Sequence, residues 1–302
     1  MNKSPVAIIV YNRPEKALIV LKQIHKYQPK ELFVIADGPK LNDVLDKKKC
    51  EKVKRLINSL EWDCKVNINY SSHNLGLKKR VISGLNWVFQ SVESAIILED
   101  DCVPSEDFFS FCDEMLAFYK NNTKVGCITG VNFQDGIIRG KGSYYFSKYN
   151  HCWGWASWRR SWDLFSEDLN FWPEYKKSKD WKKKFNLYRE KLFWTKHFDY
   201  CYEDDVNSWA ANWTLSLFLN NSITVTPQKN LVSNIGHGID STHTQDSDSK
   251  YSNMNTFELK NIIHPDEIKL DIDADNYTFD NHFRGYELKF INRLIRFIKK
   301  WI

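Results

Sequence analysis

Short apolar runs alternate with longer amphipathic stretches over the first 130 residues of the chain. Each run is followed by polar or turn-forming residues, which is typical of a buried strand. The runs predict strands at residues 6–11, 32–36, 66–70, 95–98 and 125–129. Apolar positions three or four residues apart predict helices at 14–28, 77–90 and 105–119, and a charged helix that follows Pro39 and ends near residue 60.

The alternation of strand and helix predicts the α/β fold class, with a mostly parallel central sheet flanked by helices on both faces. In such sheets, ligands bind beyond the carboxyl ends of the strands. The pattern is less regular after residue 150, where we expect a helix near 181–193 and a mobile polar loop at 236–252. We therefore expect an α/β half at 1–150, a smaller irregular half of the same domain at 151–283, and a C-terminal segment at 284–302.

The C-terminal segment carries the net charge of the chain. Residues 284–302 hold six Lys or Arg and one Glu, six minus one, which equals the net charge of +5 for the whole chain. The remaining residues are neutral in sum, which argues against nucleic acid as a partner. Apolar residues repeat at helical spacing from Phe290 to Trp301, which predicts a basic amphipathic helix. This helix either lies on an anionic membrane surface or packs on the body of the protein.

The cysteines and the N-terminus favour the cytoplasm. The chain has seven Cys and no C-x-x-C pair, so we expect free, mostly buried thiols in a reducing compartment. The first residues lack the apolar core of a signal peptide, and no stretch approaches the roughly 18 apolar residues that span a bilayer. We expect a cytoplasmic protein, peripheral on the inner face of the membrane if the C-terminal segment binds lipid.

Three acidic residues, Glu99, Asp100 and Asp101, directly follow the fourth predicted strand. Adjacent carboxylates repel one another unless a cation or hydrogen bonds offset their charge. Mg²⁺ and Mn²⁺ are hard cations that combine a few carboxylates with substrate phosphate oxygens. Such a site suits a nucleoside diphosphate leaving group, because negative charge grows on its phosphate as the bond to the sugar breaks. The alternative is a solvated acidic turn.

Three further motifs lie at the ends of the first three predicted strands: Asn-Arg-Pro at 12–14, Asp-Gly at 37–38 and His-Asn-Leu-Gly at 73–76. Together with Glu-Asp-Asp at 99–101, they resemble inverting GT-A glycosyltransferases over about residues 4–245. The resemblance is to bacterial family 2-like enzymes and to the Golgi N-acetylglucosaminyltransferase I family. It implies a GT-A (Rossmann-like) fold in which residues 1–150 bind a nucleotide sugar and residues 151–283 form the acceptor side.

The resemblance also implies roles for the acidic motif and its neighbours. Asp101 would contact a divalent metal, Mn²⁺ or Mg²⁺, while Glu99 and Asp100 would hold ribose or donor-sugar hydroxyls. Asp37 would accept a hydrogen bond from a uracil base, which implies a UDP-sugar donor, unless it is only a turn residue. Arg13 would lie near the nucleotide.

Other residues carry weaker expectations from the same resemblance. His73 and Asn74 would line the nucleotide pocket, and Lys78 or Arg80 would face a phosphate. The alternatives are a helix entry at Asn74 and a solvated basic face at Arg80. His237, in a glycine-bracketed loop, would close over the diphosphate, or it belongs to an ordinary mobile turn.

Aromatic residues crowd the second half, with nine of the twelve Trp between Trp153 and Trp213. They form either a large aromatic core or a surface that stacks on sugar faces. The segment Trp153-Gly154-Trp155 resembles the aromatic turn that lies beneath the donor sugar and the acceptor in these enzymes. Its alternative is simple core packing.

The catalytic base that the resemblance implies is missing. An inverting transfer needs a carboxylate to take the proton of the acceptor hydroxyl, and in the resembled family this Asp directly follows a Trp. Here Ala210 follows Trp209. Three hypotheses remain: an Asp→Ala substitution made to trap substrates, a natural variant that uses Glu203, Asp204 or Asp205, or an inactive binding relative.

The sequence thus favours an inverting glycosyltransferase that moves N-acetylglucosamine or a hexose from a UDP-sugar to a glycan or lipid-linked glycan. Its setting would be the synthesis of bacterial surface polysaccharide or lipopolysaccharide. Competing hypotheses are an inactive nucleotide-binding relative and a Trp-rich carbohydrate-binding protein. A nucleotidyltransferase would want a Gly-rich loop after the first strand, which Asn-Arg-Pro-Glu-Lys does not provide.

Overall fold

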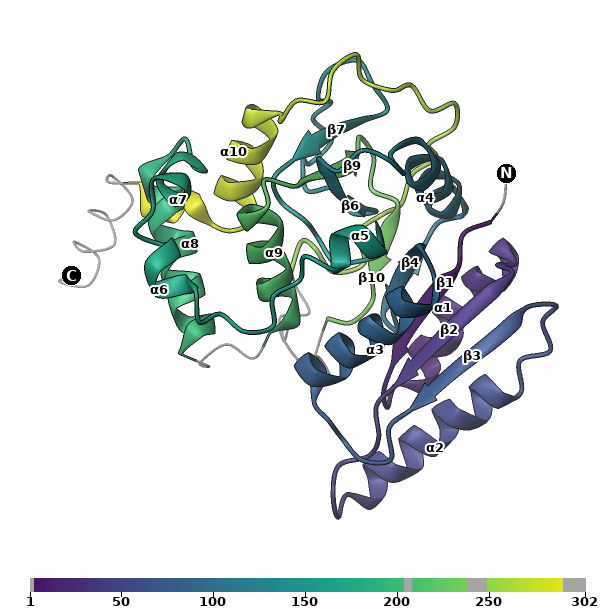
Figure 1. Cartoon of the computed structure of the whole chain (residues 1–302). Coiled ribbons are helices and arrows are strands. Elements are labelled where there is room, and N and C mark those ends of the chain that lie inside the picture. The colour runs from purple at the N-terminus through teal and green to yellow at the C-terminus, as the bar shows by residue number, and fades with distance from the viewer. Residues whose placement is uncertain (1–2, 204–207, 238–248, 290–302) are drawn as a thin grey trace, which may run out of the picture.

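Figure 1 shows the computed structural model, which describes residues 3–203, 208–237 and 249–289. Eight strands form the central sheet in the order β3-β2-β1-β4-β8-β6-β9-β7. The strands are β1 (Val6–Val10), β2 (Glu31–Ala36), β3 (Lys65–Tyr70), β4 (Ser94–Glu99), β6 (Val125–Thr129), β7 (Tyr144–Ser147), β8 (Trp155–Trp158) and β9 (Ile223–Pro227). The first four are parallel, β6 is parallel to β9, and β8 and β7 run antiparallel to their neighbours. A separate two-stranded sheet pairs β5 (Cys102–Pro104) with β10 (Val232–Asn234).

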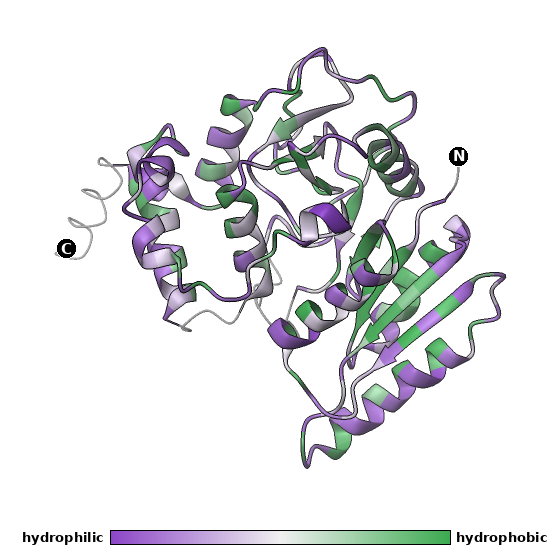
Figure 2. Ribbon diagram, viewed as in Figure 1, coloured by the Kyte–Doolittle hydropathy of each residue, from purple (hydrophilic) through white to green (hydrophobic). Residues whose placement is uncertain are grey.

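Helices cover both faces of the sheet. One core cluster joins the sheet to α1 (Pro14–Tyr27), α2 (Val44–Asn58) and α4 (Glu106–Phe118). A second joins it to α3 (Leu77–Ser91), α5 (Arg159–Trp162) and α9 (Trp209–Leu219). Strand β1 contributes side chains to both faces of the sheet. Its alternate residues enter the first cluster (Val6, Ile8 and Val10) and the second cluster (Ala7 and Ile9). A strand buried on both faces reads as a continuous apolar run. In Figure 2, β1 and β2 are accordingly hydrophobic along their length, whereas the edge strand β3 is mixed.

The predicted α/β class, with a mostly parallel sheet between helices, is confirmed. Each of the five predicted strands is present within one residue of its predicted ends. The charged helix begins later than predicted, at Val44, because residues after Pro39 form a turn with Asn42 in the left-handed region at φ 60°. Asp43 then caps the helix by accepting from the Asp46 amide at 2.9 Å.

The second half packs short helices into a third, aromatic cluster. Its elements are α6 (Trp172–Tyr175), α7 (Lys179–Lys183), α8 (Tyr188–Tyr202), α10 (Ile272–Asn281) and the 3₁₀ helix η1 (Gly285–Leu288). The prediction of one helix near 181–193 is wrong, since α7 ends at Lys183 and α8 begins at Tyr188. Trp181 and Phe185 make an edge-to-face contact at 4.8 Å inside the cluster. The chain therefore turns between the two helices so that side chains from both reach the same core.

The tryptophans between Trp153 and Trp213 are mostly core. Eight of the nine are at most 4% exposed, and Trp153 alone is half-buried. The core interpretation is therefore confirmed for those eight. All seven cysteines are unpaired and five of them are buried, as expected.

The C-terminal segment is described only as far as residue 289, so most of the predicted amphipathic helix lies outside the described residues. Its described start is anchored to the body, because Arg189 donates to the carbonyl of Gly285 at 2.9 Å and Lys289 pairs with Asp280 at 2.9 Å. Across the described ranges, no helix has both the length and the apolar character needed to cross a bilayer. The division near residue 150 stays a prediction.

Candidate active site

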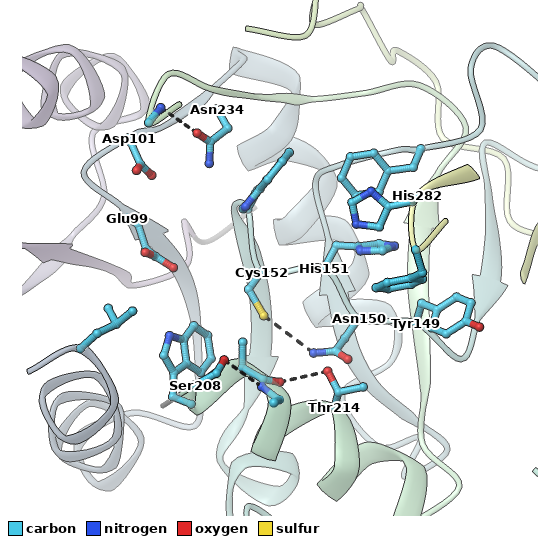
Figure 3. Close-up of a pocket in the computed structure, with 18 of the residues that line it drawn as sticks. Glu99, Asp101, Tyr149, Asn150, His151, Cys152, Ser208, Thr214, Asn234 and His282 are labelled. Atoms are coloured by element: carbon cyan, nitrogen blue, oxygen red, sulfur yellow. Dashed lines mark hydrogen bonds between the residues drawn. The ribbon is translucent and has the colours of Figure 1, made fainter. Parts of the chain in front are cut away.

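A cavity of about 350 Å³ lies between the acidic motif and the second half of the chain. Glu99 and Asp101 stand on one side of it, and His151 and His282 stand opposite (Figure 3). Strand β4 presents the acids, because its buried apolar run ends where the sheet ends. The lining also includes Arg13, Trp153, Asn150, Trp194, Asn234, Gly236, Ser208, Trp209 and Ala210. The cavity thus brings together residues from both predicted halves.

Arg13 holds the acidic motif together. Its guanidinium donates to Asp101 Oδ2 at 2.8 Å and also hydrogen-bonds Asp100, which accepts in addition from the Tyr11 amide at 3.4 Å. Burial raises the pKa of Glu99 above its ordinary value, and the nearby charges of Asp101 and Asp100 raise it further. Burial likewise raises the pKa of Asp100, although Arg13 opposes the shift. One guanidinium therefore bonds two of the three acidic residues, while burial favours the neutral form of Glu99.

Asp101 is enclosed by the segment that follows β10. The Ile235 amide donates to the Asp101 carbonyl at 2.9 Å, and a Cβ on Gly236 would lie 2.0 Å from Asp101 Oδ2. Only glycine fits at position 236 without displacing the carboxylate. No cluster of three His, Cys, Asp or Glu able to hold a metal occurs among the described residues. A hard cation that keeps water and takes substrate phosphate oxygens needs only one or two carboxylates, so the acids present fit a metal site that the substrate would complete.

Asp37 and Asn74 connect the segments that follow β2 and β3 through hydrogen bonds. Neither residue is part of the cavity lining. The Asp37 carboxylate accepts from the amides of Gly38, Leu75 and Gly76 at 2.8, 2.9 and 3.1 Å, and from Asn74 Nδ2 at 3.1 Å. These bonds give Asp37 the turn-forming role that was the alternative to nucleotide contact, whereas Asn74 does not cap α3, whose N-cap residue is Gly76. Contact of either residue with a nucleotide stays a prediction.

Arg80 and His73 also lie outside the lining of this cavity. The Arg80 guanidinium is buried and donates to the carbonyls of Ala36 and Asn69, at the ends of β2 and β3. Burial lowers the pKa of Arg80. The hydrogen bonds of Arg80 fix the ends of the two strands, so this buried side chain matches neither a phosphate ligand nor a solvated basic face. His73 is exposed to solvent.

The aromatic turn supports the cavity from one side. Gly154 has φ 65°, its carbonyl accepts from the Gly130 amide at 2.8 Å, and a Cβ there would meet Val232 at 2.7 Å. Trp155 is buried and stacks on Trp209 at 5.8 Å, so it lies behind the lining rather than in it. Trp153 is in the lining and packs edge-to-face on His237 at 5.6 Å.

Ala210 lies in the cavity, in the first turn of α9. Ser208 caps this helix by accepting from the Ala211 amide at 3.3 Å, and Thr214 donates to the Ala210 carbonyl at 3.0 Å. Ala210 therefore lies at the surface of the cavity, where it also packs against the second core cluster. Asp204 and Asp205 lie outside the described residues, and Glu203 directly follows α8 as its C-cap residue.

The sequence did not indicate the side of the cavity opposite the acids. We call this side, which contains His151, His282, Asn150 and Trp194, the histidine wall. Burial lowers the pKa of His151 well below its ordinary value and lowers that of His282 to about 3, so both imidazoles are neutral at pH 7. His282 stacks on Phe133 at 3.8 Å. Buried polar atoms of Asn150 (Oδ1), Trp194 (Nε1) and His282 (Nδ1) have no hydrogen-bond partner among the described residues. The wall is therefore uncharged and offers polar atoms to a ligand.

No protein-family model and no curated protein matches the chain. Among solved structures, it is similar to the mannosyltransferase PcManGT from Pyrobaculum calidifontis in complex with GDP-Man and Mn²⁺, at 13% identity, with a TM-score of 0.40 and coverage of 72% of this chain and 70% of that one. It is also similar to HddC from Yersinia pseudotuberculosis (11%, TM-score 0.33, 57% and 86%) and to mouse xyloside xylosyltransferase 1 in its apo form (12%, 0.29, 45% and 55%). Since these likenesses concern the fold alone, the assignment of a function rests on the residues of the site.

Proposed function

We propose that this protein is a glycosyltransferase that moves a sugar from a nucleoside diphosphate sugar to a glycan hydroxyl. One observation carries the proposal: an acidic strand end and an uncharged aromatic and polar wall line the same cavity. The acids suit a metal-bound diphosphate, and the opposite wall suits a neutral sugar. Aromatic faces pack on the apolar faces of sugars, while buried amide and indole groups bond their hydroxyls.

In the reaction, the acceptor oxygen bonds to the anomeric carbon as the bond from that carbon to the β-phosphate oxygen breaks. The proton of the acceptor hydroxyl would pass to a carboxylate base, for which Glu203, Asp204 and Asp205 are the candidates in place of Ala210. A divalent metal held by Asp101 would offset the charge that develops on the departing diphosphate. Arg13 keeps the Asp101 carboxylate in place through its bond to Oδ2. Glu99 lines the same cavity and would accept hydrogen bonds from donor hydroxyls.

The finer proposal follows the resemblance. The donor is a UDP-sugar carrying N-acetylglucosamine or a hexose, the displacement inverts the anomeric configuration, and the acceptor is a glycan or lipid-linked glycan. The pathway is the synthesis of bacterial surface polysaccharide or lipopolysaccharide, at the inner face of the membrane. An inactive nucleotide-binding relative is a second candidate, because Ala210 stands where the resembled enzymes carry the base.

Calorimetric titration with UDP and Mn²⁺ tests the donor site. We expect metal-dependent binding by the wild type and a loss of at least about tenfold in Asp101→Asn, because the amide removes the charge that binds the cation. The matched control is Asp180→Asn, an exposed carboxylate of α7 outside the cavity, which should bind as the wild type does. If UDP, GDP and other nucleoside diphosphates fail to bind with and without metal, the protein is not a nucleotide-sugar transferase, and the Trp-rich carbohydrate-binding hypothesis takes its place.

Asn150→Leu tests the acceptor side. Asn150 is 7% exposed and its Oδ1 has no partner among the described residues, so a sugar hydroxyl is its natural donor. We expect the acceptor KM to rise about tenfold, which corresponds to the loss of one buried hydrogen bond. The affinity for UDP in the same variant should stay within about twofold of wild type. An equal loss in both affinities would show a general disturbance of the fold instead.

A further inference from the structure

Three large apolar side chains stand in solvent at the start of α2. Leu41, Val44 and Leu45 are 90%, 65% and 72% exposed, and Leu41 and Leu45 are the two most exposed large apolar side chains in the described part of the chain. Single exposed apolar residues are ordinary on protein surfaces, but contiguous ones mark contact sites. We call residues 40–52 the α2 tip; α2 lies at the bottom of the molecule in Figure 1.

Lysines surround this apolar group. Lys47, Lys48, Lys49 and Lys52 are all exposed, and none of them forms an ion pair with a described residue. The α2 tip, residues 40–52, holds five Lys and three Asp or Glu, a local net charge of five minus three, or +2. Apolar side chains ringed by lysines complement a surface that is apolar inside and anionic outside.

The tip is held in place by hydrogen bonds. The Asp46 carboxylate is buried and accepts from Tyr11 Oη at 2.5 Å, from Asn12 Nδ2 at 2.6 Å and from the Lys40 amide at 2.7 Å. One of the three acids of this segment is thereby turned inward, and the turn that carries Leu41 has a fixed conformation. Since Leu41 and Leu45 stay exposed in a defined structure, the tip is preorganised for a partner.

The same bonds connect the tip to the cavity. Tyr11 and Asn12 directly precede Arg13, which bonds Asp100 and Asp101. The tip therefore lies at the same edge of the sheet as the acidic motif, beyond the carboxyl ends of β1 and β2. A surface bound by the tip lies beside the cavity that we assign to the sugar substrates.

We propose that the α2 tip docks on an anionic lipid membrane, with Leu41 and Leu45 among the headgroups and the lysines against lipid phosphates. The proposal does not depend on the glycosyltransferase activity, and it does not involve residues 290–302. Apolar burial supplies attraction to any bilayer, and the lysines supply the preference for anionic lipid.

Co-sedimentation of the full chain with phosphatidylcholine vesicles containing about a quarter phosphatidylglycerol tests the proposal. We expect Leu41→Ser/Leu45→Ser to weaken partitioning at least about tenfold, since two leucines lose their burial. The matched control is Phe257→Ser/Ile263→Ser, which changes two apolar residues that are 53% and 61% exposed elsewhere and should bind as the wild type does. Residues 290–302 are present in every variant, so their contribution cancels in the comparison.

Lys47→Glu/Lys48→Glu should remove most of the preference for phosphatidylglycerol over pure phosphatidylcholine vesicles, and added salt should have the same effect on the wild type. Three results would overturn the proposal. They are no vesicle binding by the wild type, wild-type binding by Leu41→Ser/Leu45→Ser, and self-association in sedimentation velocity that this variant alone abolishes. The last result would make the tip an interface between two copies of the chain.

Discussion

Ala210→Asp is expected to raise the rate of sugar transfer by about a hundredfold or more. A positioned general base contributes roughly 10²- to 10⁴-fold to such reactions, and Ala210 already lines the cavity on a capped helix. An Asp side chain would extend from the first turn of α9 into the space between the acids and the histidine wall. The measurement is the release of UDP from a panel of UDP-sugars with glycan acceptors, under saturating Mn²⁺.

Ala210→Asn is the matched control, because it has the size of Asp but cannot take a proton. It should leave the rate at the level of the parent chain, and both variants should bind UDP as the parent does. Equal rates in the Asp and Asn variants would show that position 210 is not the site of a missing base. A measurable rate in the parent chain would favour the hypothesis that Glu203, Asp204 or Asp205 serves instead.

Arg13→Met should lower the free energy of unfolding by about 3–5 kcal/mol, the range for a buried ion pair that loses one partner. The side chains of Asp100 and Asp101 are only 2% and 13% exposed, so their charges would stay buried without a cation. Methionine keeps most of the apolar stem of Arg13 and removes only its charge and donors. The measurement is equilibrium unfolding by denaturant in the absence of metal, from which the midpoint and slope of the transition give the free energy of unfolding.

Two comparisons complete this experiment. Arg13→Met/Asp100→Asn should recover a large part of the lost stability, because it removes one of the unpaired charges. Lys65→Met breaks the exposed pair with Glu31, whose atoms lie 3.2 Å apart, and should change stability by at most about 1 kcal/mol. A loss in Arg13→Met no greater than that of Lys65→Met would show that solvent or another group already screens the acidic motif.

The first half of the fold could be predicted because β1, β2, β4 and β6 are buried on both faces and each helix has one apolar face, and because the half-buried edge strand β3 alternates apolar and polar residues. The second half could not, because α5, α6 and α7 have only four or five residues each and the positions of the aromatic side chains are set by packing. Trp181, Phe185 and Trp194 enter one cluster from two helices and the turn between them. The break between α7 and α8 depends on this tertiary packing, and the spacing of apolar residues along the chain does not predict it.

One side of the candidate site could be predicted from the sequence and the other could not. Its acidic side follows from one continuous stretch, since a buried strand ends at Glu99 and the next two residues are acidic. The opposite wall joins His151, from the connection between β7 and β8, to His282, at the end of α10. These residues are distant in sequence, and neither belongs to a motif, so only the tertiary structure brings them within 5.2 Å. Asp37, after β2, and Arg80, in α3, are polar residues near strand ends whose bonds stabilise the loops and strands themselves, so a polar side chain at this edge of the sheet does not by itself identify a ligand contact.

The central position of β8 affects how the chain can be assembled during synthesis. Strand β8 pairs with both β4 and β6. These two earlier strands therefore form no backbone hydrogen bonds with each other in the sheet. A nascent chain that has passed residue 118 can form β3-β2-β1-β4 with their helices, yet β4 then exposes an apolar edge formed by Ile96 and Ile97. An open edge of this kind invites pairing with other chains. Residues 155–158 close this edge, and the open edge of the growing sheet then moves to β6, where it stays until β9 pairs with it.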